Sequence, residues 1–421
     1  MNRQPRIFVL SREYPPNTVG GTSTVARNLS TGLSARGWKV VVVTTRPQRS
    51  EDLREDLAGV TVHRTGTNVT YNQDSGVTDA SVLTHRRLYQ SAVRLAGEYG
   101  PPDVVALPDL FCYPEATLLS RRYGVPVVNV LLQDFRTLTP YDRDKHHVAS
   151  GVSADRRHLY ELEEKSLRGC AHTVFISAAL SDAITGYYPG VATAHSVIHL
   201  GVDTAELGSI AGADADRARL RETLPATAYG RPLLVACGRL VPVKGFAPLL
   251  TALGRLGSAA PHLALVGVGP EEPHLRQLAR TLDIEADVTF VGDVPRRTAL
   301  TFMSMATVAV VPSLWESFCY VCAEMMALGR PVVATTVDSL NELMPSDEYG
   351  YRVAVTGSAT GRRLDPGSLA AAIGSALGDP AEASRRGARA RERMLSRFTN
   401  DRFARLMAEL CGRLGSVTAD G

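Results

Sequence analysis

Two glutamates stand eight positions apart in the run ESFCYVCAE, residues 316–324, directly after an apolar stretch that is typical of a buried strand. Glu316 falls in the turn after that stretch, and Glu324 falls about two turns inside a helix expected to begin near Phe318. At about 1.5 Å of rise per residue, the carboxylates should lie on the order of 10 Å apart along the helix axis. Two carboxylates that act on one glycosidic bond need roughly 5 to 9.5 Å. The spacing instead suits carboxylates that bind the hydroxyls of a sugar and of a ribose at opposite ends of a diphosphate.

A second stretch, CGRLVPVKGF at residues 237–246, places two cations between an apolar strand and a helix. Arg239 can donate forked hydrogen bonds and Lys244 supplies a point charge, a combination that suits a diphosphate. The alternative is two solvated surface cations. Both residues follow the carboxyl end of a strand and do not lie on a helix face, so the diphosphate interpretation is favoured.

Two glycine turns also follow apolar strands. Gly20 and Gly21 come after the run RIFVL and allow close approach of backbone N–H groups to a ligand. In VGVGPEEPHL, Gly269 completes a Gly-x-Gly pair, but Glu272 stands where the dinucleotide fingerprint needs a third glycine. A bound NAD is therefore not expected, although the tight turn could pack against a flat base.

The elements that must position these residues alternate along the chain. Short Val-, Ile- and Leu-rich runs, typical of strands buried on both faces, alternate with segments of helical period. This pattern predicts an α/β fold of doubly wound parallel sheets. The series is interrupted by a polar, Ala- and Gly-rich segment near residues 204–228. We expect two Rossmann-like domains facing across a cleft, with limits at 1–205 and 206–395, and a C-terminal helix at 396–421 that packs back toward the first domain.

Composition excludes several classes of protein. Of 421 residues, 44% are hydrophobic and 21% are charged, and the net charge is only +3, which argues against a nucleic-acid partner. No signal peptide is recognised, no apolar run approaches the ~20 residues of a membrane span, and six scattered cysteines suggest reduced thiols. A cytoplasmic protein without membrane association is expected. Cys319-x-x-Cys322 lacks the second ligand pair of a zinc site, and the Asp142-x-Asp144 pair is interpreted as solvated loop.

The ordered set GRLVPVKG, GVGP, FVGDV and PSLWESFCYVCAEMMALGRPVVAT resembles the family 4 retaining glycosyltransferases, which have the two-domain GT-B fold. The resemblance covers nearly the whole chain and is most specific from Tyr229 to about Met344. It implies transfer of a hexose from a nucleotide sugar to an acceptor hydroxyl, and we expect the donor to be a UDP-sugar. It also implies that no metal or other cofactor is needed, because cations and helix N-termini neutralise the diphosphate.

The resemblance implies particular roles at the matching positions. Arg239 and Lys244 would hold the donor diphosphate and stabilise its charge as it leaves, and Glu316 would bind the transferred hexose; these three are the expected catalytic residues. Glu324 would bind the ribose. The full set of positions expected to bind substrate is Gly20, Gly21, Gln133, Asp134, Gly269, Val294, Phe318, Cys319 and Glu324.

The chain departs from the family pattern at several of these places. Cys319 stands where the family often has Gly, Gln133 stands near a usual His, and VDSLNE at residues 337–342 replaces a turn with Gly-Gly. Glutamine can hydrogen-bond a hydroxyl but cannot carry a proton. We expect an altered substrate preference and not a loss of activity.

The acceptor is expected in the first domain. Its strand-end loops carry Glu13, Asp109, Glu115 and Asp134, an acidic set that would suit a cationic acceptor. The composition and the LLQDF segment are similar to glycosyltransferases of aminoglycoside antibiotic pathways, which transfer N-acetylglucosamine or glucose to 2-deoxystreptamine. Three alternatives stay open: a family 4 enzyme acting on a lipid, envelope or small-thiol precursor, a nucleotide-sugar 2-epimerase, and a sugar-nucleotide-binding protein without catalysis. The oligomeric state is left open.

Overall fold

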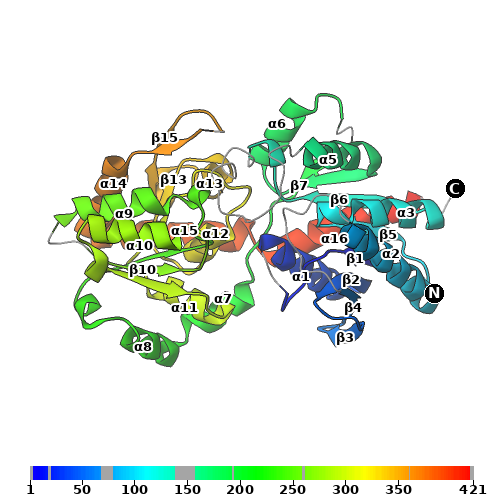
Figure 1. The fold of residues 1–421 in the computed structure, drawn as a ribbon, viewed down its shortest axis with the longest axis horizontal. Coiled ribbons are helices and arrows are strands. Elements are labelled where there is room, and N and C mark those ends of the chain that lie inside the picture. The colour runs from blue at the N-terminus through cyan, green and yellow to red at the C-terminus, as the bar shows by residue number, and fades with distance from the viewer. Residues whose placement is uncertain are drawn as a thin grey trace. The chain divides into compact units, whose positions relative to one another are not determined.

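The computed structural model describes residues 3–17, 20–67, 79–137, 157–191, 194–257, 261–359 and 361–417. The chain divides into two compact units. Unit 1 comprises Met1–Arg136, Val148–Leu200 and Asn400–Gly421, and unit 2 comprises Thr137–His147 and Gly201–Thr399. Each unit is an α/β structure built on a largely parallel sheet, which confirms the predicted fold class (Figure 1). The domain limits expected from the sequence stay a prediction about which segments fold together.

Unit 1 contains an eight-stranded sheet in the order β3-β4-β2-β1-β5-β6-β7-β8. Its strands are β1 (Arg6–Leu10), β2 (Lys39–Pro47), β3 (Leu53–Leu57), β4 (Val60–Thr67), β5 (Val104–Leu107), β6 (Val127–Leu131), β7 (His172–Phe175) and β8 (His195–Val197). All neighbours are parallel except β3 and β4. β5 and β6 are buried along their whole length and β2 is buried except at its ends, as expected of a sheet covered on both faces.

Among the described residues, unit 1 contains the helices α1 (Gly21–Ser34), α2 (Asp79–Tyr99), α3 (Tyr113–Tyr123), α5 (Arg157–Gly169), α6 (Ala178–Tyr187), α16 (Asn400–Val417) and the short η1 (Leu110–Cys112). On one face of the sheet, Phe8 and Leu10 pack with buried residues of α2 and α3. Ile7 and Val9 point the opposite way and are fully buried. The C-terminal helix α16 packs against α1 and β5, so the end of the chain belongs to unit 1.

Unit 2 contains a six-stranded, wholly parallel sheet in the order β11-β10-β9-β12-β13-β14. Its strands are β9 (Leu233–Cys237), β10 (His262–Val266), β11 (Val288–Gly292), β12 (Val308–Val311), β13 (Val332–Thr335) and β14 (Tyr351–Val353). A separate two-stranded hairpin is formed by β15 (Val355–Thr356) and β16 (Arg363–Leu364). This hairpin follows directly after β14 in the sequence.

The helices of unit 2 are α7 (Thr204–Ala211), α8 (Asp214–Glu222), α9 (Phe246–Arg255), α10 (Glu272–Thr281), α11 (Arg296–Met305), α12 (Tyr320–Ala327), α13 (Asp338–Leu343), α14 (Pro366–Gly378) and α15 (Pro380–Arg397). Single turns occur at η2 (Ala226–Ala228), η3 (Pro242–Lys244), η5 (Glu285–Asp287) and η6 (Asp347–Tyr349). Helices α9, α10 and α14 share one hydrophobic core with the sheet. Among the described residues, no helix combines the length and the apolar character that crossing a membrane requires.

The strand order reverses once in each sheet, between β1 and β5 in unit 1 and between β9 and β12 in unit 2. In open parallel sheets, ligands bind outside the carboxyl ends of the strands at such a reversal. In unit 2, the loops that leave the sheet at this point are the two stretches that the sequence singled out.

Candidate active site

Lys244 and Glu316 meet at the strand reversal of unit 2. Lys244 follows β9 and Glu316 follows β12, and Lys244 Nζ donates to Glu316 Oε1 at 2.6 Å. The Ser313 hydroxyl donates to the same oxygen at 2.8 Å. The two charged side chains are mainly buried, with 24% and 8% exposed. Burial lowers the pKa of Lys244, but the charge of Glu316 acts in the opposite direction and the net pKa is raised, so the ammonium stays protonated.

Glycine at position 245 lets these two loops approach each other. Gly245 has φ of +69°, and a Cβ there would lie 2.0 Å from the carbonyl oxygen of Pro312. Next to this contact, the Leu314 N–H donates to the Val243 carbonyl at 2.7 Å. The close backbone contact fixes Lys244 beside the loop that carries Glu316.

Arg239 lies in the same loop as Lys244 but is exposed. Its positive charge lowers the pKa of Lys244, which shows that the two cations act on the same region. Within the part of the chain that the structure describes, the Arg239 guanidinium makes no hydrogen bond or ion pair, while the Arg239 carbonyl accepts from the Val241 N–H at 2.9 Å. The expected pair of cations therefore consists of one ammonium held by Glu316 and one guanidinium open to solvent.

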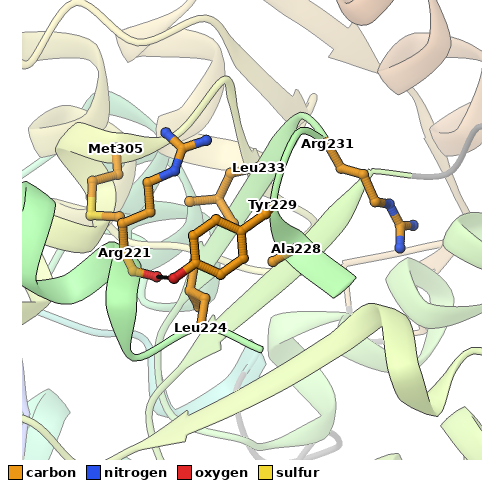
Figure 2. Close-up of a pocket in the computed structure, with 7 residues that line it drawn as sticks. All are labelled: Arg221, Leu224, Ala228, Tyr229, Arg231, Leu233 and Met305. Atoms are coloured by element: carbon orange, nitrogen blue, oxygen red, sulfur yellow. Dashed lines mark hydrogen bonds between the residues drawn. The ribbon is translucent and has the colours of Figure 1, made fainter. Parts of the chain in front are cut away.

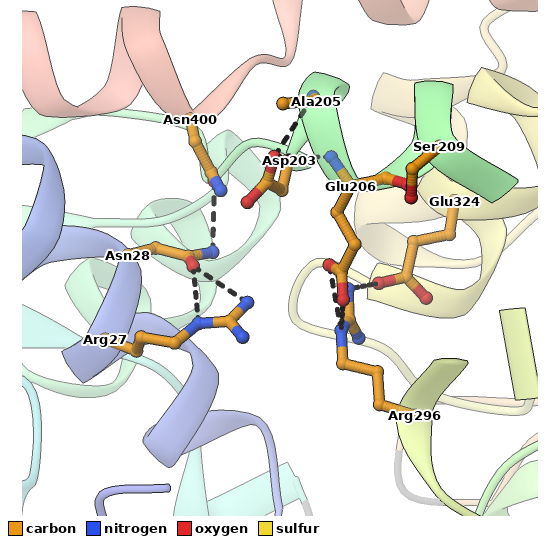
Figure 3. Close-up of polar contacts among 9 residues, drawn as sticks. All are labelled: Arg27, Asn28, Asp203, Ala205, Glu206, Ser209, Arg296, Glu324 and Asn400. Carbon is orange, nitrogen blue, oxygen red and sulfur yellow. Dashed lines mark hydrogen bonds and ion pairs between the residues drawn. The ribbon is translucent and has the colours of Figure 1, made fainter. Parts of the chain in front are cut away.

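Glu324 lies in a second cluster, which the sequence did not reveal in full. Helix α12 begins at Tyr320, two residues later than expected, so Glu324 is in its second turn. Glu324 is only 2% exposed, and Arg296 Nη2 donates to its Oε1 at 2.7 Å. Arg296 also donates to both carboxylate oxygens of Glu206, at 2.9 to 3.0 Å (Figure 3). One feature of the sequence could have indicated the role of Arg296: it is the first residue of a helix that directly follows the strand in FVGDV.

This cluster places a guanidinium beside a buried carboxylate. Burial lowers the pKa of Arg296, but the charges of Glu324 and Glu206 outweigh burial and the pKa is raised. A guanidinium between two carboxylates offsets the cost of burying Glu324. Glu206, on α7, and Arg296, on α11, thus join two helices of unit 2 at the side chain expected to bind a ribose.

Phe318 and Cys319 precede α12. The Phe318 side chain is buried, and its ring packs edge-on against the Tyr320 ring with 5.3 Å between the ring centroids. Phe318 therefore belongs to the core and not to an open binding surface. Cys319 adopts φ of +69°, a left-handed conformation in which glycine is favoured. Burial and the charge of Glu316 raise the pKa of the Cys319 thiol well above its usual range. The thiol is therefore neutral and poorly reactive.

Gly269 and Val294 follow β10 and β11 at the same edge of the sheet as Lys244 and Glu316. A Cβ at Gly269 would lie 2.3 Å from the Leu240 carbonyl oxygen, so glycine is required here for contact between two loops. Val294 is half-buried. Their expected contact with a base stays a prediction.

In unit 1, the glycine turn is already engaged in a hydrogen bond. The Gly20 N–H donates to Glu13 Oε2 at 3.1 Å, and Gly21 is the first residue of α1. Gln133, half-buried, follows β6, and the buried Asp134 accepts a hydrogen bond from the Arg136 N–H at 2.8 Å. Binding of phosphate at Gly20 would therefore require Glu13 to release this N–H group.

The four carboxylates expected to attract a cationic acceptor are all buried. Asp109 accepts two hydrogen bonds from the Arg12 guanidinium, at 2.9 and 3.1 Å. Glu115 Oε1 lies 2.5 Å from His85 Nδ1. Glu13 accepts from the Gly20 N–H, and Asp134 accepts from the Arg136 N–H. These residues do not form the open acidic surface that the sequence suggested, because each carboxylate accepts hydrogen bonds within unit 1.

Two further features lie apart from these residues. A small pocket opens near the start of β9, where Tyr229, Leu233 and Met305 contribute to its lining (Figure 2). None of the expected site residues lines it. In the described residues, no three His, Cys, Asp or Glu side chains gather as a metal site would need. The Asp142-x-Asp144 pair lies outside the described residues.

Comparison with known proteins identifies both units. The model of "Glycosyltransferase Family 4" matches residues 19–206, and that of "Glycosyl transferases group 1" matches residues 225–393. A glycogen synthase of Mycobacterium tuberculosis is 29% identical over 93% of this chain and 91% of its own length. A D-inositol 3-phosphate glycosyltransferase of Acidothermus cellulolyticus is 29% identical over 85% of this chain and 81% of its own length.

Solved structures share the fold. Sucrose-phosphate synthase from Thermosynechococcus elongatus superposes with a TM-score of 0.78 at 23% identity, covering 98% of this chain and 100% of that one. The Anabaena protein HepE, in complex with UDP-glucose, superposes with a TM-score of 0.72 at 19% identity, covering 97% of this chain and 100% of that one. With both units matched by family models, the chain is a hexosyltransferase of the GT-B fold and belongs to the family 4 glycosyltransferases.

Proposed function

We propose that the protein transfers glucose or N-acetylglucosamine from a UDP-sugar to a hydroxyl of a small sugar or cyclitol, with retention of configuration. The observation that carries this proposal is the 2.6 Å contact between Lys244 and Glu316. The bond that breaks joins the sugar C1 to a phosphate oxygen. The cation that binds the phosphate and the carboxylate that binds the sugar must therefore be neighbours, and these two residues are.

Each residue has a distinct part in the proposed reaction. Lys244 and Arg239 neutralise the diphosphate, and Glu316 accepts hydrogen bonds from hexose hydroxyls. Glu324, oriented by Arg296, accepts hydrogen bonds from the ribose. The acceptor oxygen attacks C1 on the face that the phosphate leaves, the C1–O bond to phosphate breaks, and the proton of the acceptor hydroxyl passes to a phosphate oxygen. The steps require no metal.

We infer the class of acceptor from the similar proteins, because the acidic residues of unit 1 are buried and form hydrogen bonds within that unit. Proteins named glycogen synthase and D-inositol 3-phosphate glycosyltransferase point to a sugar or a cyclitol. 2-Deoxystreptamine is also a cyclitol, and it is the acceptor that the sequence favours. Among cyclitols, the departure at Gln133 gives a reason to expect a preference unlike that of the relatives.

A matrix of donors and acceptors tests this proposal. UDP-glucose and UDP-N-acetylglucosamine are each incubated with 2-deoxystreptamine, inositol 3-phosphate and glycogen, and products are identified by mass spectrometry. We expect a glycosylated cyclitol, and anomeric analysis of that product shows whether configuration is retained. Donor-only incubation that releases UDP and an epimerised sugar would indicate an epimerase. Donor binding without any product over the whole panel would indicate a binding protein, and transfer only to lipid in anionic vesicles would replace the proposed acceptor.

A further inference from the structure

Arg362 contacts the backbone beside Glu316. It belongs to the connection between β15 and β16, and its Nη1 donates to the Leu314 carbonyl at 3.0 Å. The same guanidinium donates to both carboxylate oxygens of Asp338, with Nη2 2.7 Å from Oδ1. The Arg362 and Asp338 side chains are 14% and 19% exposed. A fork held by two bonds to a carboxylate has a fixed orientation, so its contact with Leu314 is fixed as well.

Asp338 has a conformation that needs support from its surroundings. It is the first residue of α13 and has φ of +38°, which is uncommon for a residue with a Cβ. The next residue, Ser339, donates from its hydroxyl to the Glu316 carbonyl at 3.2 Å. The start of α13 therefore contacts the Glu316 segment twice, directly through Ser339 and indirectly through Asp338 and Arg362.

The Leu314 backbone links the segments that carry the two members of the proposed catalytic pair. The Leu314 carbonyl accepts from Arg362, while the Leu314 N–H donates to the carbonyl of Val243, and Val243 is the residue before Lys244. Glu316 is two residues further along the chain. A shift of this peptide would change the distance between the Lys244 ammonium and the Glu316 carboxylate, and displacements of about 1 Å can reduce a rate roughly 100-fold.

We infer that Arg362 is a positioning residue: it holds the Leu314 peptide so that Glu316 and Lys244 keep their contact, and Asp338 orients its guanidinium. Arg362 touches neither Glu316 nor Lys244 in any hydrogen bond found among the described residues. The inference rests on the proposed function only for the assignment of Glu316 to the hexose. The structural part, control of the 313–316 segment by Arg362, stands independently of that assignment.

Four variants of the full-length chain test this inference. Arg362→Met removes the contact with Leu314, Arg362→Lys keeps one donor but loses the fork, and Asp338→Gly removes the orienting carboxylate while relieving its positive φ. Arg363→Met is the matched control, because Arg363 is exposed on the same hairpin. The measurements are kcat and KM for the donor, the Kd for UDP by calorimetry, the melting temperature, and hydrogen exchange of peptides covering residues 313–318.

For Arg362→Met we expect kcat to fall about 10- to 100-fold, with the Kd for UDP within about threefold and faster exchange in residues 313–318. Arg362→Lys should be intermediate. Asp338→Gly should lower kcat without lowering the melting temperature, a combination that a merely structural role would not produce. The Arg363→Met control should match the wild type.

Wild-type kcat in Arg362→Met would overturn the inference, as would losses of UDP affinity and kcat in equal proportion. Unchanged hydrogen exchange in residues 313–318 would overturn it too. If the wild-type protein shows no transfer with any donor, the proposed function fails, while the exchange comparison still decides whether Arg362 holds the segment.

Discussion

Lys244 Nζ lies 2.6 Å from Glu316 Oε1 although 72 positions separate the two residues in the sequence. Their strands, β9 and β12, are neighbours at the reversal of the sheet order, and this adjacency brings the loops together. Unit 1 has an equivalent pair. Arg12 follows β1 and Asp109 follows β5, and they form an ion pair at 2.9 Å across the reversal of that sheet. In each sheet, the place where ligands are expected is therefore occupied by two opposite charges from separate loops.

Replacing Glu316 by Ala should abolish transfer while sparing the nucleotide. The carboxylate is assigned to the hexose, whereas UDP contains no hexose, so we expect kcat to fall at least about 100-fold and the Kd for UDP to change by less than about threefold. Without the opposing charge of Glu316, burial should also lower the pKa of Lys244, since burial is the largest influence on that group. Steady-state kinetics and calorimetry check the first two effects.

The exposed Glu285→Ala variant serves as a control for a lost carboxylate on the same unit. A rate for Glu316→Ala near that of the control would remove Glu316 from the reaction. Loss of UDP binding together with activity would instead assign Glu316 to the nucleotide, or show that the Lys244 contact is needed for folding.

Replacing Arg296 by Met should weaken UDP binding and destabilise unit 2. Glu324 is only 2% exposed in the structure, and the variant removes the guanidinium that donates to it. The loss of a hydrogen bond to a buried polar group costs about 1 to 3 kcal/mol, and a carboxylate that is no longer oriented binds ribose hydroxyls less well. We expect a decrease of that size in the free energy of unfolding and a Kd for UDP raised about 10-fold.

Arg297 offers a matched control for this experiment. It is the next residue on α11 and pairs with Asp216 at 2.8 Å, but both side chains of that ion pair are well exposed. Arg297→Met should change the stability by less than about 0.5 kcal/mol. If Arg296→Met binds UDP as tightly as this control, Glu324 does not depend on Arg296 for nucleotide binding.

The strands and the Lys244 and Glu316 loops could be predicted because both leave a local trace. A strand buried on both faces is a continuous apolar run, and polar residues directly after such a run lie at the carboxyl edge of the sheet. The contact between Arg296 and Glu324 could not be predicted, because it depends on which helices become neighbours and not on local spacing. The prediction of an open acidic surface in unit 1 failed for a related reason. The ion pair between Arg12 and Asp109 buries Asp109, and such a pairing between separate loops leaves no pattern in the sequence.

The left-handed conformation of Cys319 predicts that glycine would be more stable there. Cys319 has φ of +69°, which costs a residue with a Cβ about 1 to 2 kcal/mol. Glycine avoids that cost but gains flexibility in the unfolded chain, worth about 0.4 to 1 kcal/mol. We expect Cys319→Gly to be about 1 kcal/mol more stable than Cys319→Ala in urea unfolding. Equal stabilities of the two variants would show that the backbone at this position is not left-handed in solution.

The contact between α1 and the C-terminal helix predicts an effect of Gly32. A Cβ at Gly32 would lie 2.4 Å from the Cβ of Ala404, so Gly32→Ala forces the helices apart and should cost about 1 to 3 kcal/mol. Adding Ala404→Gly should restore most of this loss. Gly186→Ala in α6 is the control, since nothing lies within 4 Å of its Cβ position. Urea unfolding checks all four proteins, and a Gly32→Ala variant as stable as the wild type would contradict the packing of α16 on α1.

Because burial raises the pKa of Glu163, we expect unit 1 to lose stability as pH rises. Burial is the largest influence and raises the pKa of Glu163 to about 7, with the Asp134 charge acting in the same direction and the Tyr188 hydroxyl opposing it. The folded pKa lies above the ordinary value of 4.5, so the folded state binds more protons between about pH 4.5 and 7. Stability is therefore greatest below that window and falls by up to about 3 kcal/mol as pH rises through it.

Glu163→Gln removes the titration and keeps one oxygen to accept from the Tyr188 hydroxyl, but its NH2 cannot accept the 3.3 Å bond that the Phe135 N–H donates to Glu163 Oε1. That loss is the same at every pH, so we expect the stability of the variant relative to the wild type to rise by about 2 to 3 kcal/mol between pH 5 and pH 8. Glu164→Gln is the control, because the Glu164 side chain is 40% exposed and pairs only with Arg168 on the same helix among the described residues. Urea unfolding at both pH values measures the difference. If Glu163→Gln shifts stability equally at pH 5 and pH 8, Glu163 is ionised in the folded protein across that range, and burial does not control its proton.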